Sequence, residues 1–205
     1  MHPYIIRSLA EERRRDLMAS AGAHREVLAA RAAVHASRAE ELAGIWAERT
    51  LLGVRPIERD DADRLARLFG RMTQQSVRFR FFSPVRRLSD AQLARLSDVD
   101  HDRREALVAL SNDEIVAVAR YDAPEGAREA EIAVTVEDSW QGRGVGRRLS
   151  GRLSQLAVVR GIDTFVARIL PDNRAALRLV RSLSPAAALR MDRGEYCASI
   201  PLARD

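Results

Sequence analysis

Seven short runs of apolar residues predict β-strands between residue 51 and residue 201. The clearest extends from Ala130 to Val136, where Ile132, Val134 and Val136 alternate with smaller or polar side chains. Such alternation, with β-branched residues, is typical of a strand that buries one face. The other predicted strands span 51–57, 106–110, 115–121, 164–170, about 187–192 and 195–201, with a hairpin turn at Ser111-Asn112-Asp113-Glu114 between the second and the third.

Apolar residues at helical spacing predict four helices among these strands. After Val136, Leu149, Leu153 and Leu156 recur three or four residues apart and predict a helix over 144–160. Asp, Ser and Asn are favoured at helix N-caps, and they mark the other three starts. These helices are expected to begin at Asp60 or Asp61, with Leu65, Leu68 and Phe69 inward, at Ser89-Asp90, and at Arg174 after Pro171-Asp172-Asn173.

The order of these elements predicts the fold class. It reads strand, two helices, three strands, helix, strand, helix, two strands, which indicates an α/β (α+β) domain over residues 51–205, a mixed central sheet flanked by helices. Residues 1–48 are rich in alanine, arginine and glutamate, and predict a helical N-terminal extension. A docking arm, a dimerisation element and a helix packed on its own domain are all compatible with that segment.

A glycine-rich segment follows the strand that ends at Val136. Glycines occupy positions 142, 144 and 146, and the helical pattern begins directly after them. Glycine lets the backbone approach a ligand closely, consecutive N–H groups point at its oxygens, and a helix N-terminus adds about half a positive charge. Arg143, Arg147 and Arg148 add full charges beside it. The segment therefore predicts a pocket for a diphosphate.

The spacing of the glycines narrows the choice of diphosphate ligand. A Walker loop requires a lysine, and the chain contains none, while the dinucleotide fingerprint requires glycine where Arg147 stands. The pattern Gln141-x-x-Gly144-x-Gly146 after an acidic, alternating strand instead resembles the acetyl-CoA pyrophosphate loop of the GNAT family of N-acyltransferases. The resemblance implies the GNAT fold over residues 51–205 and acetyl-CoA as co-substrate.

The same resemblance implies roles for individual residues. Glu131, in Ala130-Glu131-Ile132-Ala133, matches the family's acidic residue, which implies a general base that acts directly or through water. A sheet-edge carboxylate in a salt bridge is the alternative. Asn173 matches the asparagine that contacts the cofactor, and it is also a natural helix cap. Backbone amides of Val134, Thr135 and Val136 would hold the pantetheine and polarise the acetyl carbonyl, and Gln141, Gly142, Arg143, Gly144, Val145, Gly146 and Arg147 would hold the pyrophosphate.

Two departures from the family pattern concern the end of the reaction. Many relatives carry a tyrosine about seven residues after the asparagine, where it protonates the leaving thiolate, but this chain has Val180. Either another donor serves or the thiolate leaves unaided, which is feasible because a thiol has a pKa of about 8.5. The usual Gly-Phe after this helix is replaced by Leu183-Ser184-Pro185, so the shape of the acceptor pocket stays open.

A more specific resemblance concerns the acceptor. The run from Ser76 to Ser83, Leu88-Ser89-Asp90, the run from Asp98 to Asp102 and Ala106-Leu107-Val108-Ala109 resemble the acetyltransferase domain of bacterial protein lysine acetyltransferases, with His101 where a tyrosine often lies. This implies a lysine amine on a protein substrate. A small amine as acceptor, or an acyl-CoA-binding regulatory module with little turnover, are the alternatives. The aromatic run from Arg78 to Pro84 would pack in the core, cover the sheet edge or line the acceptor groove.

Composition and charge restrict the other partners. The chain is 46% hydrophobic and 31% charged, without a run of about 18 apolar residues, so a globular protein without a membrane span is expected. A single cysteine, Cys197, excludes an internal disulfide and favours a reducing cytoplasm. The net charge of +5 comes from 34 arginines and suits an anionic cofactor. Acidic residues are interspersed among the arginines and no basic-aromatic cluster appears, so nucleic acid is not expected as a partner. No metal is expected either.

Overall fold

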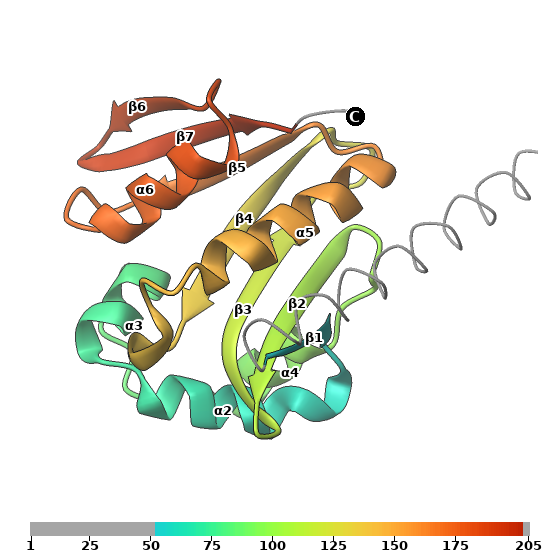
Figure 1. Ribbon diagram of the computed structural model, residues 1–205, viewed down its shortest axis with the longest axis vertical. Helices are drawn as coiled ribbons and strands as arrows, with labels where there is room; N and C mark the ends of the chain where they lie inside the picture. Colours follow the sequence, from blue (N-terminus) through green and yellow to red (C-terminus); the bar gives the residue numbers. More distant parts are fainter. Residues whose placement is uncertain (1–51, 203–205) are drawn as a thin grey trace, which may run out of the picture. The chain divides into compact units, whose positions relative to one another are not determined.

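A computed structural model describes residues 52–202, which form a seven-stranded sheet with helices on both faces (Figure 1). The helical extension predicted over residues 1–48 lies outside the described residues. The strands run in the order β1-β2-β3-β4-β5-β7-β6. Neighbouring strands are antiparallel except β4 and β5, so the predicted mixed sheet is confirmed. None of the helices in this part of the chain is long and apolar enough to cross a membrane.

The bounds of the elements agree with the predicted strands to within a few residues. The strands are β1 (Gly53–Pro56), β2 (Arg104–Ser111), β3 (Glu114–Asp122), β4 (Glu129–Val136), β5 (Thr164–Ile169), β6 (Ala188–Asp192) and β7 (Glu195–Pro201). The helices are α2 (Ala62–Arg71), α3 (Gln74–Phe81), α4 (Asp90–Ser97), α5 (Val145–Val159) and α6 (Arg174–Leu183), with 3-10 turns η1 (Arg59–Asp61) and η2 (Asp138–Trp140).

Two hydrophobic cores lie on opposite faces of the sheet because successive side chains of a strand point to opposite sides. Leu107 and Ala109 of β2 belong to the core under α5, which crosses one face of the sheet (Figure 1). Ala106 and Val108 of the same strand belong to the core under α2 and α4. Ile132 of β4 packs in the α5 core, so its neighbour Glu131 points to the other face.

The predicted helix caps hold at two of three positions. The Ser89 hydroxyl accepts from the Gln92 amide and the Gln92 side chain accepts from the Ser89 amide, which is a capping box. Asn173 caps α6, its Oδ1 atom accepting from the Ala176 amide at 3.0 Å. Asp61 stands at the N-cap of α2, yet its side chain caps nothing there.

The Asp61 side chain instead binds a residue of the first strand, β1. Its buried carboxylate accepts from both terminal nitrogens of Arg55, at 2.6 and 2.8 Å, and from the Glu58 amide at 2.9 Å. Burial by itself would raise the pKa of Asp61, but these hydrogen bonds hold the pKa below its ordinary value. Asp61 therefore occupies the predicted N-cap position, but the prediction that its side chain caps α2 was wrong. The short turn η1 brings this carboxylate back to Arg55 instead.

One helix was not predicted. The aromatic run belongs to α3, which begins after the Thr73 cap and ends at Phe81, just before Phe82 with its φ of +59°. Arginine and phenylalanine alternate through this run, so the sequence pattern has the period of a strand rather than of a helix. The ring of Phe81 packs at 5.3 Å from that of Phe69 on α2, and this tertiary contact supports the helix.

A gap in the sheet opens between β4 and β5 (Figure 1). β4 pairs with β3 as far as Val136 but with β5 only over Glu129–Glu131. The Glu137 amide donates to the Val116 carbonyl, and amide directions alternate along an antiparallel strand. The amides of Val134 and Val136 therefore point into the gap, where no strand among residues 52–202 pairs with them.

Candidate active site

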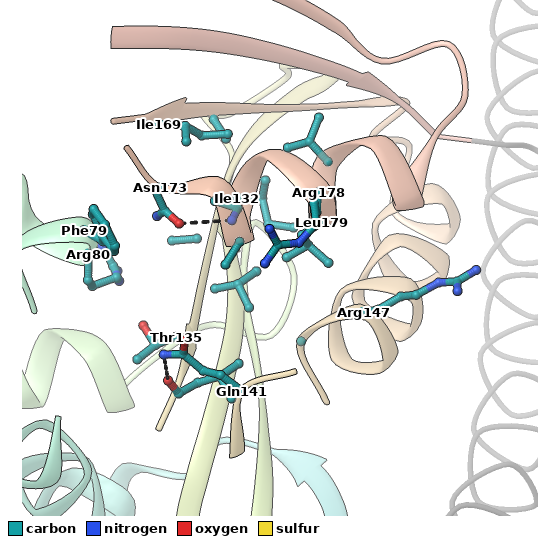
Figure 2. A pocket seen from close by; sticks show the side chains of 18 of the residues that line it. Phe79, Arg80, Ile132, Thr135, Gln141, Arg147, Ile169, Asn173, Arg178 and Leu179 are labelled. Atoms are coloured by element: carbon teal, nitrogen blue, oxygen red, sulfur yellow. Dashed lines mark hydrogen bonds between the residues drawn. The ribbon is translucent and has the colours of Figure 1, made fainter. Parts of the chain in front are cut away.

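The gap between β4 and β5 forms one side of a cavity of about 590 Å³, a volume that suits a small-molecule ligand. Its walls come from α3, β4, the loop before α5, the end of β5 and α6. Figure 2 shows Phe79 and Arg80 on the α3 side, across from Asn173 and Leu179. The predicted site residues that line it are Glu131, Val134, Thr135, Val136, Gln141, Gly142, Gly144, Val145, Gly146, Arg147 and Asn173.

The glycine loop presents backbone rather than side chains to this cavity. Gly142 and Gly144 adopt φ of +73° and +80°, in the left-handed region that favours glycine. No side chain caps α5, so the amides of its first turn are left for a ligand. A Cβ at Gly146 would lie 3.4 Å from the Val136 side chain, so this glycine also lets α5 pack closely on β4. The loop has the backbone geometry of an anion site.

Gln141 and Arg143 of the loop have partners within the protein. The Gln141 amide group donates to the Val136 carbonyl at 3.1 Å (Figure 2) and to the Ser76 hydroxyl at 3.3 Å. Its side chain therefore fixes the loop to β4 and α3. The Arg143 guanidinium lies 5.0 Å above the Trp140 ring, and Arg143 is not among the residues that line the cavity. The structure thus places Arg143 apart from the other predicted loop residues.

Asp138 connects this loop to α3, and the sequence analysis missed it as a site residue. Its carboxylate accepts from the Thr73 amide and hydroxyl, both at 2.9 Å, and from the Ser76 hydroxyl at 2.7 Å. Burial alone would raise the pKa of Asp138, but the hydrogen bonds from Ser76 and Thr73 lower it below the ordinary value. Asp138 therefore holds the two walls of the cavity together in its ionised form.

The lowered pKa of Asp138 gives a pH-dependent contribution to stability. Because the pKa is lower in the folded than in the unfolded protein, the contribution is present above the unfolded-state pKa and is lost as pH falls through the folded-state pKa. We expect Asp138→Asn to lower the free energy of unfolding at pH 7 by about 1 kcal/mol, with a difference from wild type that shrinks as pH falls below the unfolded-state pKa of about 3.9. Urea titrations measure this. Asp60→Asn, at an exposed position, is the control, and a pH-independent difference would contradict the assignment.

Glu131 lies where the gap begins. It is the last residue of β4 that pairs with β5, and its exposed side chain lines the cavity on the α3 side. Within residues 52–202 its carboxylate has no ion pair and accepts no hydrogen bond, so the alternative of a sheet-edge salt bridge is not observed there. The charge of Glu131 acts on Arg80 of α3. A carboxylate in this position is available to take a proton.

The helix α6 brings Asn173 to the cavity but carries no tyrosine that could protonate a thiolate. The cap to Ala176 occupies the Asn173 oxygen and leaves its NH2 group for a ligand, so both expected roles are compatible. Val180 is buried in the α5 core. Tyr121 and Tyr196, the tyrosines of the described residues, do not line the cavity.

Further lining residues come from α3 and α6. Arg174 and Arg178 lie one turn apart on α6 and line the cavity. The sequence could have predicted that they are neighbours, because the Asn173 cap fixes where the helix begins. Arg78 of α3 forms an ion pair of 2.7 Å with Asp172, which lies just before α6. Two of the roles expected for the aromatic run are observed. Phe81 packs in the core, while Phe79 and Phe82 line the cavity. The other lining residues not predicted include Met72, Ser76, Arg80, Trp140, Ile169 and Leu179.

Comparison with known proteins identifies the family. A family model described as an acetyltransferase (GNAT) domain matches residues 52–183. The acetyltransferase PA5475 of Pseudomonas aeruginosa is 29% identical over 142 residues, 64% of this chain and 76% of that protein. The acetyltransferase Pat of Mycolicibacterium smegmatis is 37% identical over 109 residues, 51% of this chain but only 32% of Pat.

Solved structures agree with this match. The GNAT domain of S. lividans PAT is 32% identical, with a TM-score of 0.69, and the match covers 74% of this chain and 90% of that one. The family model covers most of the chain, and the gap between β4 and β5 leads to the glycine loop. The chain belongs to the GNAT family of acetyltransferases, with acetyl-CoA as its acetyl donor.

Proposed function

We propose that the protein transfers the acetyl group of acetyl-CoA to a lysine amine on a protein substrate, with Glu131 as general base. The observation that carries this proposal is the unpaired Glu131 carboxylate where β4 and β5 separate. The resemblance of residues 76–83 and 98–102 to bacterial protein lysine acetyltransferases supports the choice of acceptor class. The match to Pat covers 32% of that protein. In this proposal residues 51–205 are the acetyltransferase domain and residues 1–48 are a separate extension.

Each wall of the cavity has a part in the proposed reaction. The glycine loop and the N-terminus of α5 would hold the pyrophosphate, and the amides of Val134 and Val136 would bind the pantetheine arm and polarise the thioester carbonyl. Glu131 would take one proton from the ammonium form of the acceptor, and the neutral nitrogen then bonds to the acetyl carbon and releases its second proton to water. The carbon–sulfur bond then breaks, and the thiolate leaves unaided because its thiol has a pKa of about 8.5.

The proposal also includes the cellular compartment of the enzyme and the class of its partner. Cys197 is a free thiol in β7, which is compatible with a reducing cytoplasm. A protein substrate, rather than nucleic acid or a membrane, is the proposed partner. The presence of Glu131 in the same cavity as the glycine loop favours catalysis over a regulatory module that only binds acyl-CoA.

The absence of lysine from the chain makes the test direct. The purified chain is to be incubated with acetyl-CoA, alone and with a library of lysine-containing peptides or with small amines. We expect acetyl-lysine in the peptides and at most one added acetyl group on the chain itself, at its terminal amine, because arginine stays protonated and cannot compete as an acceptor. Intact-mass analysis measures both. Transfer to small amines alone would refute the protein acceptor.

A further inference from the structure

Arg80 is a cation in the cavity wall without a carboxylate in contact. It lies on α3, lines the cavity beside Glu131 and is partly buried. In the described part of the chain no carboxylate lies within ion-pair distance of its guanidinium, which lies 5.2 Å above the centre of the Phe81 ring. Burial lowers the pKa of Arg80, and attraction to Glu131 only partly opposes this. A desolvated cation of this kind gains from an anion that enters the site.

The side chains around Arg80 carry more positive than negative charge. Arg120 of β3 is close enough to repel it, and burial followed by this repulsion lowers the pKa of Arg120 to about 10. Arg120 donates to the Leu96 carbonyl at 3.1 Å and has no ion pair within residues 52–202. The charged groups that act on this pair are Arg95, Arg104, Asp122 and Glu131, and Asp122 is already paired with Arg104 at 3.4 Å.

We propose that Arg80 binds a carboxylate that the acceptor carries close to its reactive amine. Glu131 attracts the ammonium form of the acceptor and then takes its proton, while Arg80 can hold a carboxylate through two parallel hydrogen bonds. The site therefore matches an acceptor with an amine and a carboxylate side by side. This inference rests on the proposed acetyl transfer with Glu131 as base.

The anionic groups of acetyl-CoA leave Arg80 free for this role. The pyrophosphate is assigned to the glycine loop and the start of α5, whereas Arg80 belongs to α3 and interacts with Glu131 at the opposite end of the β4 segment that lines the cavity. Two sources of the carboxylate share this chemistry. One is an acidic side chain beside the target lysine, and the other is the free carboxylate of an amino acid.

The test compares acceptors that differ only in the carboxylate. The CoA-bound protein is titrated with a lysine peptide that carries a neighbouring glutamate, with the same peptide carrying glutamine, and with a free amino acid and its amide. We expect the acidic member of one pair to bind at least tenfold more tightly. Arg80→Gln should abolish that preference and leave the affinity for acetyl-CoA unchanged. Arg86→Gln, at an exposed position after α3 that does not line the cavity, should keep the preference.

The outcomes separate this inference from the proposed function. The pair that shows the preference identifies the source of the carboxylate. Equal binding within both pairs by the wild type overturns the role of Arg80, whatever the variants do, and so does a preference that survives in Arg80→Gln. A preference without acetyl transfer refutes the proposed reaction and leaves the anion site standing. If Arg80→Gln does not fold, Arg80→Lys replaces it in the test. A preference in Arg80→Lys equal to that of the wild type would contradict binding of the carboxylate through two parallel hydrogen bonds.

Discussion

A Glu131→Gln variant is expected to bind acetyl-CoA as the wild type does and to transfer acetyl groups about 10² to 10⁴ times more slowly. Glutamine has nearly the same size and keeps the oxygen, but it cannot accept a proton at neutral pH. The Glu131 side chain has no hydrogen bond or ion pair to lose within residues 52–202, so its replacement should leave the fold intact. Calorimetric titration with acetyl-CoA and steady-state rates measure the two effects.

The rate deficit of Glu131→Gln should depend on pH in a defined direction. A free lysine amine has a pKa of about 10.4, so the fraction that is already neutral increases as pH rises. The deficit should therefore shrink toward high pH. Glu129→Gln is the matched control, because Glu129 lies on the same strand with an exposed side chain and does not line the cavity. A Glu131→Gln rate near that of the wild type at pH 7 would refute the general base.

A Gly144→Val variant is expected to bind acetyl-CoA at least tenfold more weakly, a loss of about 1.4 kcal/mol. Gly144 has φ of +80° and is the N-cap of α5. A residue with a Cβ costs about 1–2 kcal/mol in the left-handed region, and a β-branched one tolerates it least. The Cβ itself would approach only the Arg148 Nε atom, at 3.9 Å, so the effect comes from the backbone conformation. A rearranged loop no longer directs its amides at the pyrophosphate.

The control for Gly144→Val lies in the same helix. Gly151→Ala places a Cβ that meets no atom within 4 Å. Because alanine is a better helix former, this change should raise the free energy of unfolding by about 0.5–1 kcal/mol without affecting acetyl-CoA binding. Calorimetry on both variants decides the assignment. Unchanged affinity in Gly144→Val would remove the pyrophosphate from this loop.

The sequence alone predicted those features whose causes are local. Short apolar runs placed the seven strands, since β4 alternates between a buried and an exposed face while β2 and β3 are continuous runs buried on both faces. The Ser89 and Asn173 caps were predictable because a cap bonds to an amide three residues away. The glycine loop followed from glycine itself, which alone takes positive φ at Gly142 and Gly144 without strain.

The tertiary structure decided what depends on residues far apart in the chain. The helix α3 has an alternating pattern that predicts no helix, and it is held by Phe69 and by Asp138, whose bond to Ser76 spans 62 positions. The gap between β4 and β5 arises because the two strands stop pairing at Glu131. The local sequence pattern of a strand does not predict where its pairing with another strand ends. Arg80 faces Glu131 only because α3 packs beside β4, which brings side chains of the two segments together across the cavity.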